Sequence, residues 1–122
     1  MAWERIQAHA AAEREREVCG LLLGQAGHVS AVMPARNVAA DPRRRFEIDP
    51  ATLFAAIRAE RAGGPKLLGS YHRPPTGSPE PSVADRETAA GDGKLWLIVA
   101  GAEIGVWRSG REGFEPVALE LC

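Results

Sequence analysis

Apolar and polar residues recur with two different periods along the chain, and the changes of period predict its first elements. Trp3, Ile6 and Ala10 are spaced as on one face of a helix, which predicts an amphipathic helix over residues 3–16. Residues 18–24 (VCGLLLG) form a short apolar run closed by glycine, which is typical of a buried strand. After a turn at 25–27, the weaker alternation of residues 28–33 predicts a second strand that forms a hairpin with the first.

The middle of the chain combines chain breakers with one further amphipathic helix. Residues 34–42 contain an Asn and an Asp-Pro pair and predict an irregular segment, and residues 44–48 predict a short strand. Asp49 and Pro50 suit the cap and the first position of a helix. We expect that helix to end at the Gly-Gly-Pro run 63–65.

The remaining half of the chain predicts strands around one short helix. The predicted elements are a strand at 66–73, a proline-rich loop at 74–81, a helix at 82–90, and strands at 95–100, 103–108 and 114–121. The order of elements predicts an α/β fold with a mixed central β-sheet flanked by about three helices, in a single domain over residues 1–122.

Composition narrows the classes of protein without indicating any chemistry. The 122 residues carry 15 basic and 16 acidic side chains, a balance that argues against a general nucleic-acid binder. No apolar run reaches the length of a membrane span, and no apolar signal-peptide core follows the N-terminus. The two cysteines, Cys19 and Cys122, exclude a four-cysteine zinc site and fit a reducing compartment. We therefore expect a cytoplasmic protein with no nucleic-acid or membrane partner.

Four polar residues at the ends of predicted elements are candidates for a shared site. Glu17 precedes the buried strand 18–24, His72 stands near the end of strand 66–73, and Ser82 and Asp85 begin the next helix. His and Asp side chains are good zinc ligands, and a Glu beside a zinc-activated water can act as a general base. The ends of several elements can converge on one site in α/β folds.

Each of these residues also has a purely structural interpretation. The Ser82-x-x-Asp85 pair is the pattern of a helix N-cap with an acid in the first turn. His72 fits a hydrogen-bonded core histidine, and Glu17 fits the last charge of a solvated run. Spacing does not decide between the two interpretations.

The order of these motifs resembles a known family. Glu17 comes just before a Cys-Gly-Leu-Leu-Leu-Gly run, and His72-Arg73-Pro74-Pro75 is followed by six residues and then by Ser82-x-x-Asp85. This arrangement is similar to the JAMM domain, also called JAB or MPN, in its short prokaryotic form. Residues 6–10, 45–50 and 97–99 also resemble the family, so the likeness covers nearly the whole chain. The resemblance implies the JAMM fold, a layered fold like that of cytidine deaminases.

The resemblance also implies an activity and a role for each candidate residue. Intact members are zinc metallopeptidases that cut after the Gly-Gly tail of ubiquitin-like or sulfur-carrier proteins. By analogy, His72 and Asp85 would bind Zn²⁺. Glu17 would be the catalytic base, and Ser82 would help to hold the oxyanion. The expected partner is the C-terminal tail of a ubiquitin-like or sulfur-carrier protein.

One position departs from the family pattern, because the second motif His is replaced by Pro74. Alternate residues of a strand point to the same face, so a His at this position would bind the same metal as His72. Catalytic zinc sites use three protein ligands, and proline cannot serve as one. Losing a ligand should cost more than the roughly 10–100-fold in metal affinity that changes around the ligands cost.

The sequence offers few replacements for the lost ligand and leaves two functions open. Cys19 lies two residues from Glu17, on the same strand face, and is one candidate replacement. Cys122 of a second subunit is another, and His9 and His28 have no assigned role as ligands. The first function is a metallopeptidase of reduced activity. The second is a metal-free module that binds a ubiquitin-like protein or another partner. The apolar strands near the C-terminus would suit a homodimer.

Overall fold

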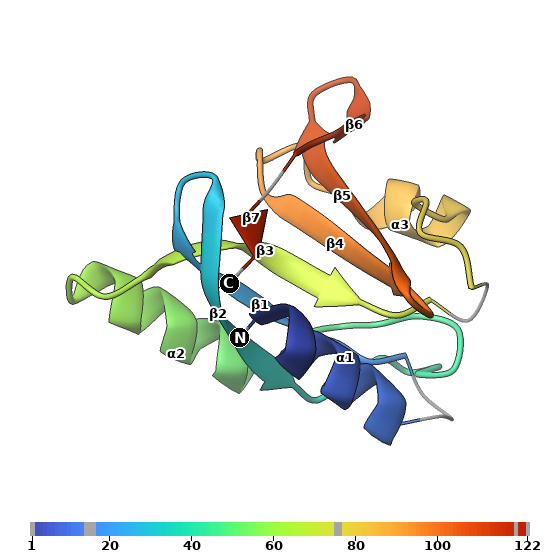
Figure 1. Cartoon of the computed structure of the whole chain (residues 1–122), viewed down its shortest axis with the longest axis horizontal. Coiled ribbons are helices and arrows are strands. Elements are labelled where there is room, and N and C mark those ends of the chain that lie inside the picture. Colours follow the sequence, from blue (N-terminus) through green and yellow to red (C-terminus); the bar gives the residue numbers. More distant parts are fainter. Residues whose placement is uncertain (1, 14–16, 75–76, 119, 122) are drawn as a thin grey trace.

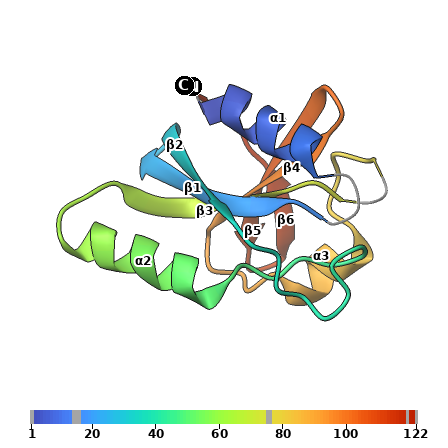
Figure 2. The ribbon, with the colours of Figure 1, turned by 90° about the horizontal axis from the view of Figure 1, so that it is seen from below.

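The central sheet lies between one helix on one face and two helices on the other, as Figures 1 and 2 show. The computed structural model describes residues 2–13, 17–74, 77–118 and 120–121. Helix α1 (Ala2–Ala12) covers the first face, and α2 (Pro50–Arg61) and α3 (Val83–Thr88) lie against the second. The predicted mixed α/β fold with three flanking helices is confirmed. None of the described helices is long and apolar enough to span a bilayer.

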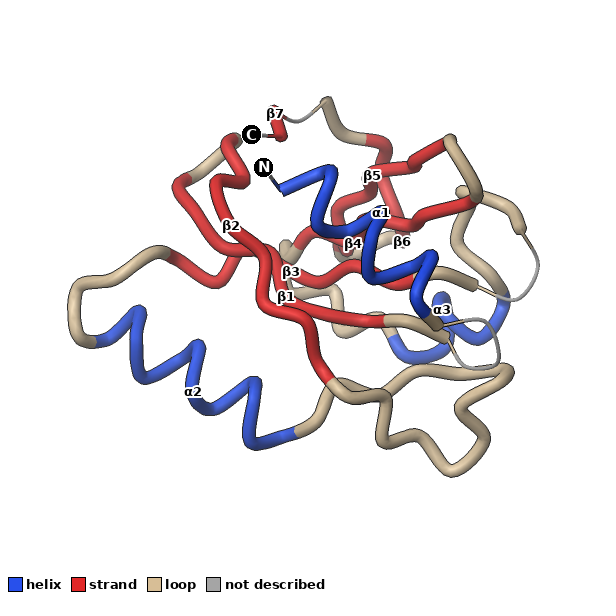
Figure 3. Tube along the Cα trace, turned by 60° about the horizontal axis from the view of Figure 1, so that its bottom comes forward, coloured by secondary structure: helices blue, strands red, loops and turns tan. Residues whose placement is uncertain are grey.

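The sheet has seven strands in the order β6-β5-β4-β3-β1-β2-β7. Their bounds are β1 (Cys19–Gln25), β2 (His28–Ala35), β3 (Lys66–His72), β4 (Leu95–Ala100), β5 (Glu103–Gly110), β6 (Gly113–Pro116) and β7 (Glu120–Leu121). β1 pairs antiparallel with both β2 and β3, whereas β3 and β4 are parallel because the chain crosses through α3 between them. Figure 3 traces this crossover.

Both faces of the sheet are buried, which explains the continuous apolar run in β1. Leu22 belongs to the cluster that contacts α1, together with Ile6 and Tyr71. Its neighbours Leu21 and Leu23 belong to the second cluster, which includes Ala56 of α2. Successive side chains of a strand point to opposite faces, so a strand covered on both sides must be apolar at every position.

A glycine in β1 allows a large aromatic side chain to lie against the sheet. Gly20 lies opposite Tyr71 in the antiparallel register, and a Cβ atom at Gly20 would come within 2.3 Å of the Tyr71 ring. Tyr71 is fully buried, and its hydroxyl is hydrogen-bonded to Nδ1 of His9 in α1 at 2.8 Å. The ring therefore links the sheet to the first helix and cannot easily move aside.

The predicted strand at residues 44–48 is wrong. Only Ile48 makes a β-bridge, to Asn37, and residues 42–44 form a turn. The backbone N–H groups of Arg44 and Arg45 both donate to the carbonyl of Asp41, which curls the chain where the pattern suggested an extended segment. Phe46 and Ile48 are apolar because they cover the sheet from this loop, not because they belong to a strand.

Other boundaries differ by smaller amounts. The first helix ends at Ala12, and residues 14–16 of the predicted helix lie outside the described residues. The predicted strand at 114–121 is divided into β6 and β7, which occupy opposite edges of the sheet. Pro116 has no N–H for a ladder, and β7 instead pairs in parallel with the start of β2.

We expect Gly20→Ala to destabilise the fold, because the added methyl group would overlap a buried ring that cannot withdraw. Overpacking of this kind costs about 1–3 kcal/mol. Urea unfolding followed by circular dichroism measures the free energy of unfolding. The control is Ser30→Ala at an exposed position of β2, which should change it by less than about 0.5 kcal/mol. Equal stability of the two variants would contradict the close packing of Tyr71 on Gly20.

Candidate functional site

His72 ends β3 and is completely buried among aromatic side chains. Its ring stacks on Phe46, with centroids 4.2 Å apart and an interplanar angle of 18°, and meets the edge of Trp96 at 5.8 Å. Neither ring nitrogen makes a hydrogen bond within the described part of the chain. A buried imidazole without hydrogen bonds is costly unless another group satisfies it.

Asp85 lies beside His72 and is held by the cap of α3. Asp85 Oδ2 is 3.3 Å from His72 Nε2, at ion-pair distance, and also accepts a hydrogen bond from the Ser82 backbone N–H at 2.9 Å. In return the Asp85 N–H donates to Ser82 Oγ at 3.1 Å, which completes a capping box. The cap predicted from the sequence is therefore real, and it also positions the carboxylate against the histidine.

The Asp85 carboxyl is kept in its charged form by its neighbours. Burial by itself would raise the pKa of Asp85, but the contacts with His72 and Ser82 outweigh burial and lower the pKa below its ordinary value. An ionised carboxylate next to an imidazole nitrogen is a suitable pair of ligands for a divalent metal.

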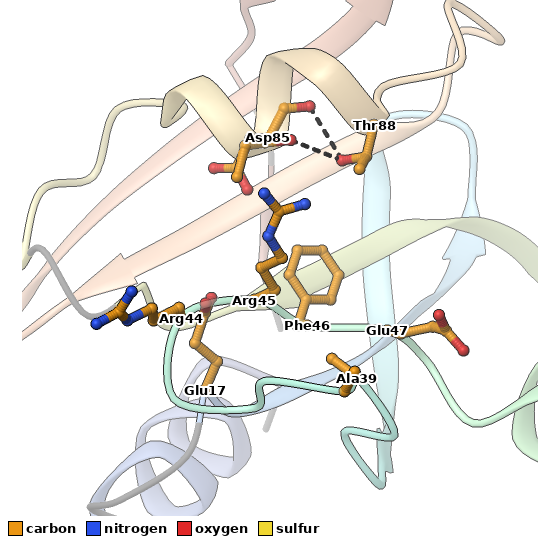
Figure 4. Close-up of a pocket in the computed structure, with 10 residues that line it drawn as sticks. Glu17, Ala39, Arg44, Arg45, Phe46, Glu47, Asp85 and Thr88 are labelled. Atoms are coloured by element: carbon orange, nitrogen blue, oxygen red, sulfur yellow. Dashed lines mark hydrogen bonds between the residues drawn. The ribbon is translucent and has the colours of Figure 1, made fainter.

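Glu17 is not part of a solvated run, because only 4% of its surface is exposed. Together with Asp85 and the loop 39–47 it lines a cavity of about 180 Å³, shown in Figure 4. Burial and then the negative charge of Asp85 raise the pKa of Glu17 to about 7, against a smaller opposing effect of Arg73. A carboxylate with this pKa is poised to accept and return a proton near neutral pH.

Asn37 organises the loop around this cavity, although the sequence marked it only as a chain breaker. Its Nδ2 group lies within hydrogen-bond distance of the carbonyls of Glu17, Pro42 and Arg45, at 3.0, 3.2 and 2.9 Å. Its Oδ1 accepts from the N–H groups of Ala39 and Glu47, both at 3.1 Å. One side chain thus joins the backbone of Glu17 to the loop that carries Phe46.

The other candidate ligands do not complete a three-residue metal site. His9 is hydrogen-bonded to Tyr71, and His28 pairs with Gln25 at the other end of β1. Cys19 lies opposite His72 in the register, but burial and then the charge of Glu17 raise the pKa of its thiol to about 12. No group of three or more His, Cys, Asp or Glu side chains suited to a metal occurs among the residues the structure describes, and Cys122 lies outside them.

Pro74 is buried and follows the end of β3 by two residues. His72 and Asp85 fit a metal as two ligands, because the buried ring nitrogens of His72 have no hydrogen-bond partner among the described residues and Asp85 Oδ2 lies 3.3 Å from Nε2. The position that the family pattern assigns to a third ligand carries a side chain that cannot coordinate.

Comparison with known proteins indicates the relatives of the chain. A family model described as prokaryotic homologs of the JAB domain matches residues 2–111. The chain is 41% identical over 91 residues to desampylase of Haloferax volcanii, and the match covers 73% of this chain and 66% of desampylase. It is 33% identical over 100 residues to tail tip assembly protein K of Escherichia phage N15, covering 82% of this chain but 39% of that protein.

Two solution structures support the same assignment of the fold. A protein from Desulfitobacterium hafniense is similar with a TM-score of 0.81 and 27% identity, covering 98% of this chain and 88% of the other. A protein from Salinibacter ruber is similar with a TM-score of 0.70 and 27% identity, covering 98% and 86%.

We expect Asn37→Ala to lower stability and to loosen the loop over the cavity. The variant leaves the partly buried Glu17 carbonyl and Ala39 N–H without their Asn37 partner, and a buried unsatisfied group costs about 1–3 kcal/mol. Urea unfolding measures the stability, and the chemical shifts of the His72 ring protons report its stacking on Phe46. The control is Glu47→Ala, an exposed side chain of the same loop. Unchanged ring shifts in Asn37→Ala would contradict the role of Asn37 in placing Phe46.

Proposed function

The chain belongs to the family of prokaryotic homologs of the JAB domain, and from this premise we propose that it is a zinc-dependent peptidase of reduced activity. Its substrate would be the bond after the Gly-Gly tail of a ubiquitin-like or sulfur-carrier protein. The observation that carries the proposal is the convergence of Glu17, His72 and Asp85, from three separate segments, at one buried site. A site kept only for packing has no need of a pair of buried carboxylates beside an unsatisfied imidazole.

The residues would divide the work between holding the metal and moving a proton. His72 and Asp85 would hold zinc, which supplies a Lewis acid that polarises the scissile carbonyl and makes water more acidic. Glu17 would take the proton from the attacking water and return it to the leaving amine. The Ser82 hydroxyl oxygen accepts the Asp85 N–H, so its own hydrogen is available to the developing oxyanion.

The surroundings of the site support a peptide as substrate. An apolar cavity of about 410 Å³ lies between α2 and the sheet and shares Thr88 with the smaller cavity that contains Glu17. Its walls include Leu53, Ile57 and Trp96. Side chains that precede a small Gly-Gly terminus could lie in the larger cavity while the terminus enters the smaller one. The similarity to desampylase supports the same class of activity.

Pro74 favours a second candidate function, a metal-free module that binds the same kind of tail. With Pro74 in place, the described residues offer two ligands, whereas catalytic zinc sites use three. The two functions differ in metal content and turnover but share the binding of the tail.

We expect Pro74→His to bind zinc at least about 10-fold more tightly than the parent and to cleave a Gly-Gly-linked fusion faster, because it supplies the third ligand. Metal analysis of protein purified without chelator gives the zinc content, and zinc titration gives the affinity. A gel assay follows the cleavage of the fusion. Cys19→Ala is the control for a substitute ligand and should leave the zinc content of the parent unchanged.

Three outcomes separate the candidates. Weak zinc binding and slow cleavage by the parent would support the proposed peptidase. Zinc binding and cleavage by Pro74→His only would identify the parent as the metal-free module. If neither protein binds zinc or cleaves the fusion at saturating zinc, the proposed peptidase is wrong.

We expect Glu17→Gln to lower the turnover of any active form by about 100-fold or more, because a general base contributes that much, while zinc stays bound. Burial raises the folded-state pKa of Glu17 above the ordinary value of 4.5, so the parent loses stability as the pH rises from 4.5 through 7. Glu17→Gln lacks this loss, so its free energy of unfolding should fall less than that of the parent between pH 5 and pH 8.

The two measurements test different claims about Glu17. Unchanged turnover in Glu17→Gln would exclude Glu17 as the base.

A further inference from the structure

The loop 39–47 places positive charge at the cavity that contains the acidic residues Glu17 and Asp85. Arg44 and Arg45 both line this cavity. Arg44 forms an exposed ion pair with Asp41, with 3.7 Å between Nε and Oδ2. Within residues 2–13, 17–74, 77–118 and 120–121, no carboxylate lies at ion-pair distance from the Arg45 guanidinium. Figure 4 shows Arg45 pointing across the cavity toward Asp85 on α3, whereas Arg44 points away.

The backbone of Arg45 is fixed even though its side chain has no ion-pair partner in the part of the chain that the structure describes. Its N–H donates to the Asp41 carbonyl at 3.0 Å, and its carbonyl accepts from Asn37 Nδ2 at 2.9 Å. Asn37 is in turn bonded to the carbonyl of Glu17. The guanidinium therefore extends from an anchored point that is tied to the backbone of the candidate base.

The cavity suits the small end of a chain. Its volume of about 180 Å³ is below the range of roughly 300–1,000 Å³ typical of sites for drug-sized ligands. Glu17 and Asp85 face each other across it, whereas the third lining carboxylate, Glu47, points away (Figure 4), so an anionic group beside them would be repelled unless a cation also faced it. Arginine provides such a cation, and its planar fork of donors matches a carboxylate with two parallel hydrogen bonds.

We propose that Arg45 binds the C-terminal carboxylate of a peptide tail that ends in glycine, and the corresponding carbonyl before cleavage. The inference deepens the proposed function, on which it rests, by naming the residue that recognises the end of the tail. It applies to the peptidase and to the binding module alike, because both must hold the tail between the loop and α3.

The test compares two synthetic probes on the full chain. One is an acetylated hexapeptide that ends in Gly-Gly with a free carboxylate, and the other is the same peptide with a C-terminal carboxamide. Binding is measured by isothermal titration calorimetry and by amide chemical shifts. We expect the parent to prefer the carboxylate by about 10-fold, the effect of a charge-assisted hydrogen bond.

Three variants of Arg45 and one control variant separate the effect of charge from that of structure. Arg45→Ala and Arg45→Gln should reduce the preference to about 1, while Arg45→Lys should keep part of it because the charge remains. Arg58→Ala removes an exposed arginine of α2 and should keep the full preference. Thermal unfolding of each variant verifies that the fold is intact, as expected for exposed side chains.

The outcomes are independent of turnover. Loss of the preference in Arg45→Ala and Arg45→Gln, with the fold intact, supports the inference even where no form of the protein cleaves a peptide. Equal binding of the two probes by the parent, binding of neither, or a full preference retained in Arg45→Ala would overturn it. Cleavage by the parent together with an unchanged preference in Arg45→Ala would overturn the inference while leaving the proposed peptidase standing.

Discussion

The antiparallel register of β1 against β3 determines both faces of this molecule. It places Gly20 opposite Tyr71, so that the ring can lie flat and reach His9 of α1. One residue further along β3, the alternation of the strand sends His72 to the other face, where α3 packs. The Arg73 N–H then donates to the carbonyl of Val18, which keeps the chain beside Glu17 at the end of β3. A shift of one residue would exchange the two faces and separate the site from the core.

Helix α3 shows that one motif can close a helix cap and also place a carboxylate at the candidate site. The helix has only six residues, too few to be stable by itself, so its capping box matters for its position. The same Asp85 oxygen that closes the box faces His72. Because one carboxylate does both, the geometry of the site depends on the start of the helix, and a metal at this position would in turn fasten α3 to the sheet.

The loop 39–47 runs where part of a strand was expected and brings two side chains to the site. Phe46 covers His72 and Arg45 faces the cavity, while Asn37, just before the loop, joins it to the backbone of Glu17. Neighbouring residues of a strand point to opposite faces, so a strand over 44–48 could not direct Arg45 and Phe46 to one place. The Arg45 guanidinium on the loop and the carboxylates of Glu17 and Asp85 thus line the same cavity.

The sequence by itself determined the order of the helices and most strands, the cap at Ser82 and Asp85, and the four candidate residues, because these depend on periods and spacings within short segments. The turn at residues 42–44 closes locally on the Asp41 carbonyl, but its place beside the site and the split of the last predicted strand were decided by tertiary structure. The contacts responsible are those of the Asn37 side chain and the parallel pairing of β7 with β2. The raised pKa of Glu17 likewise arises from burial beside Asp85, which lies far along the chain. Such contacts join residues with no common pattern in sequence, so only the folded chain could bring them together.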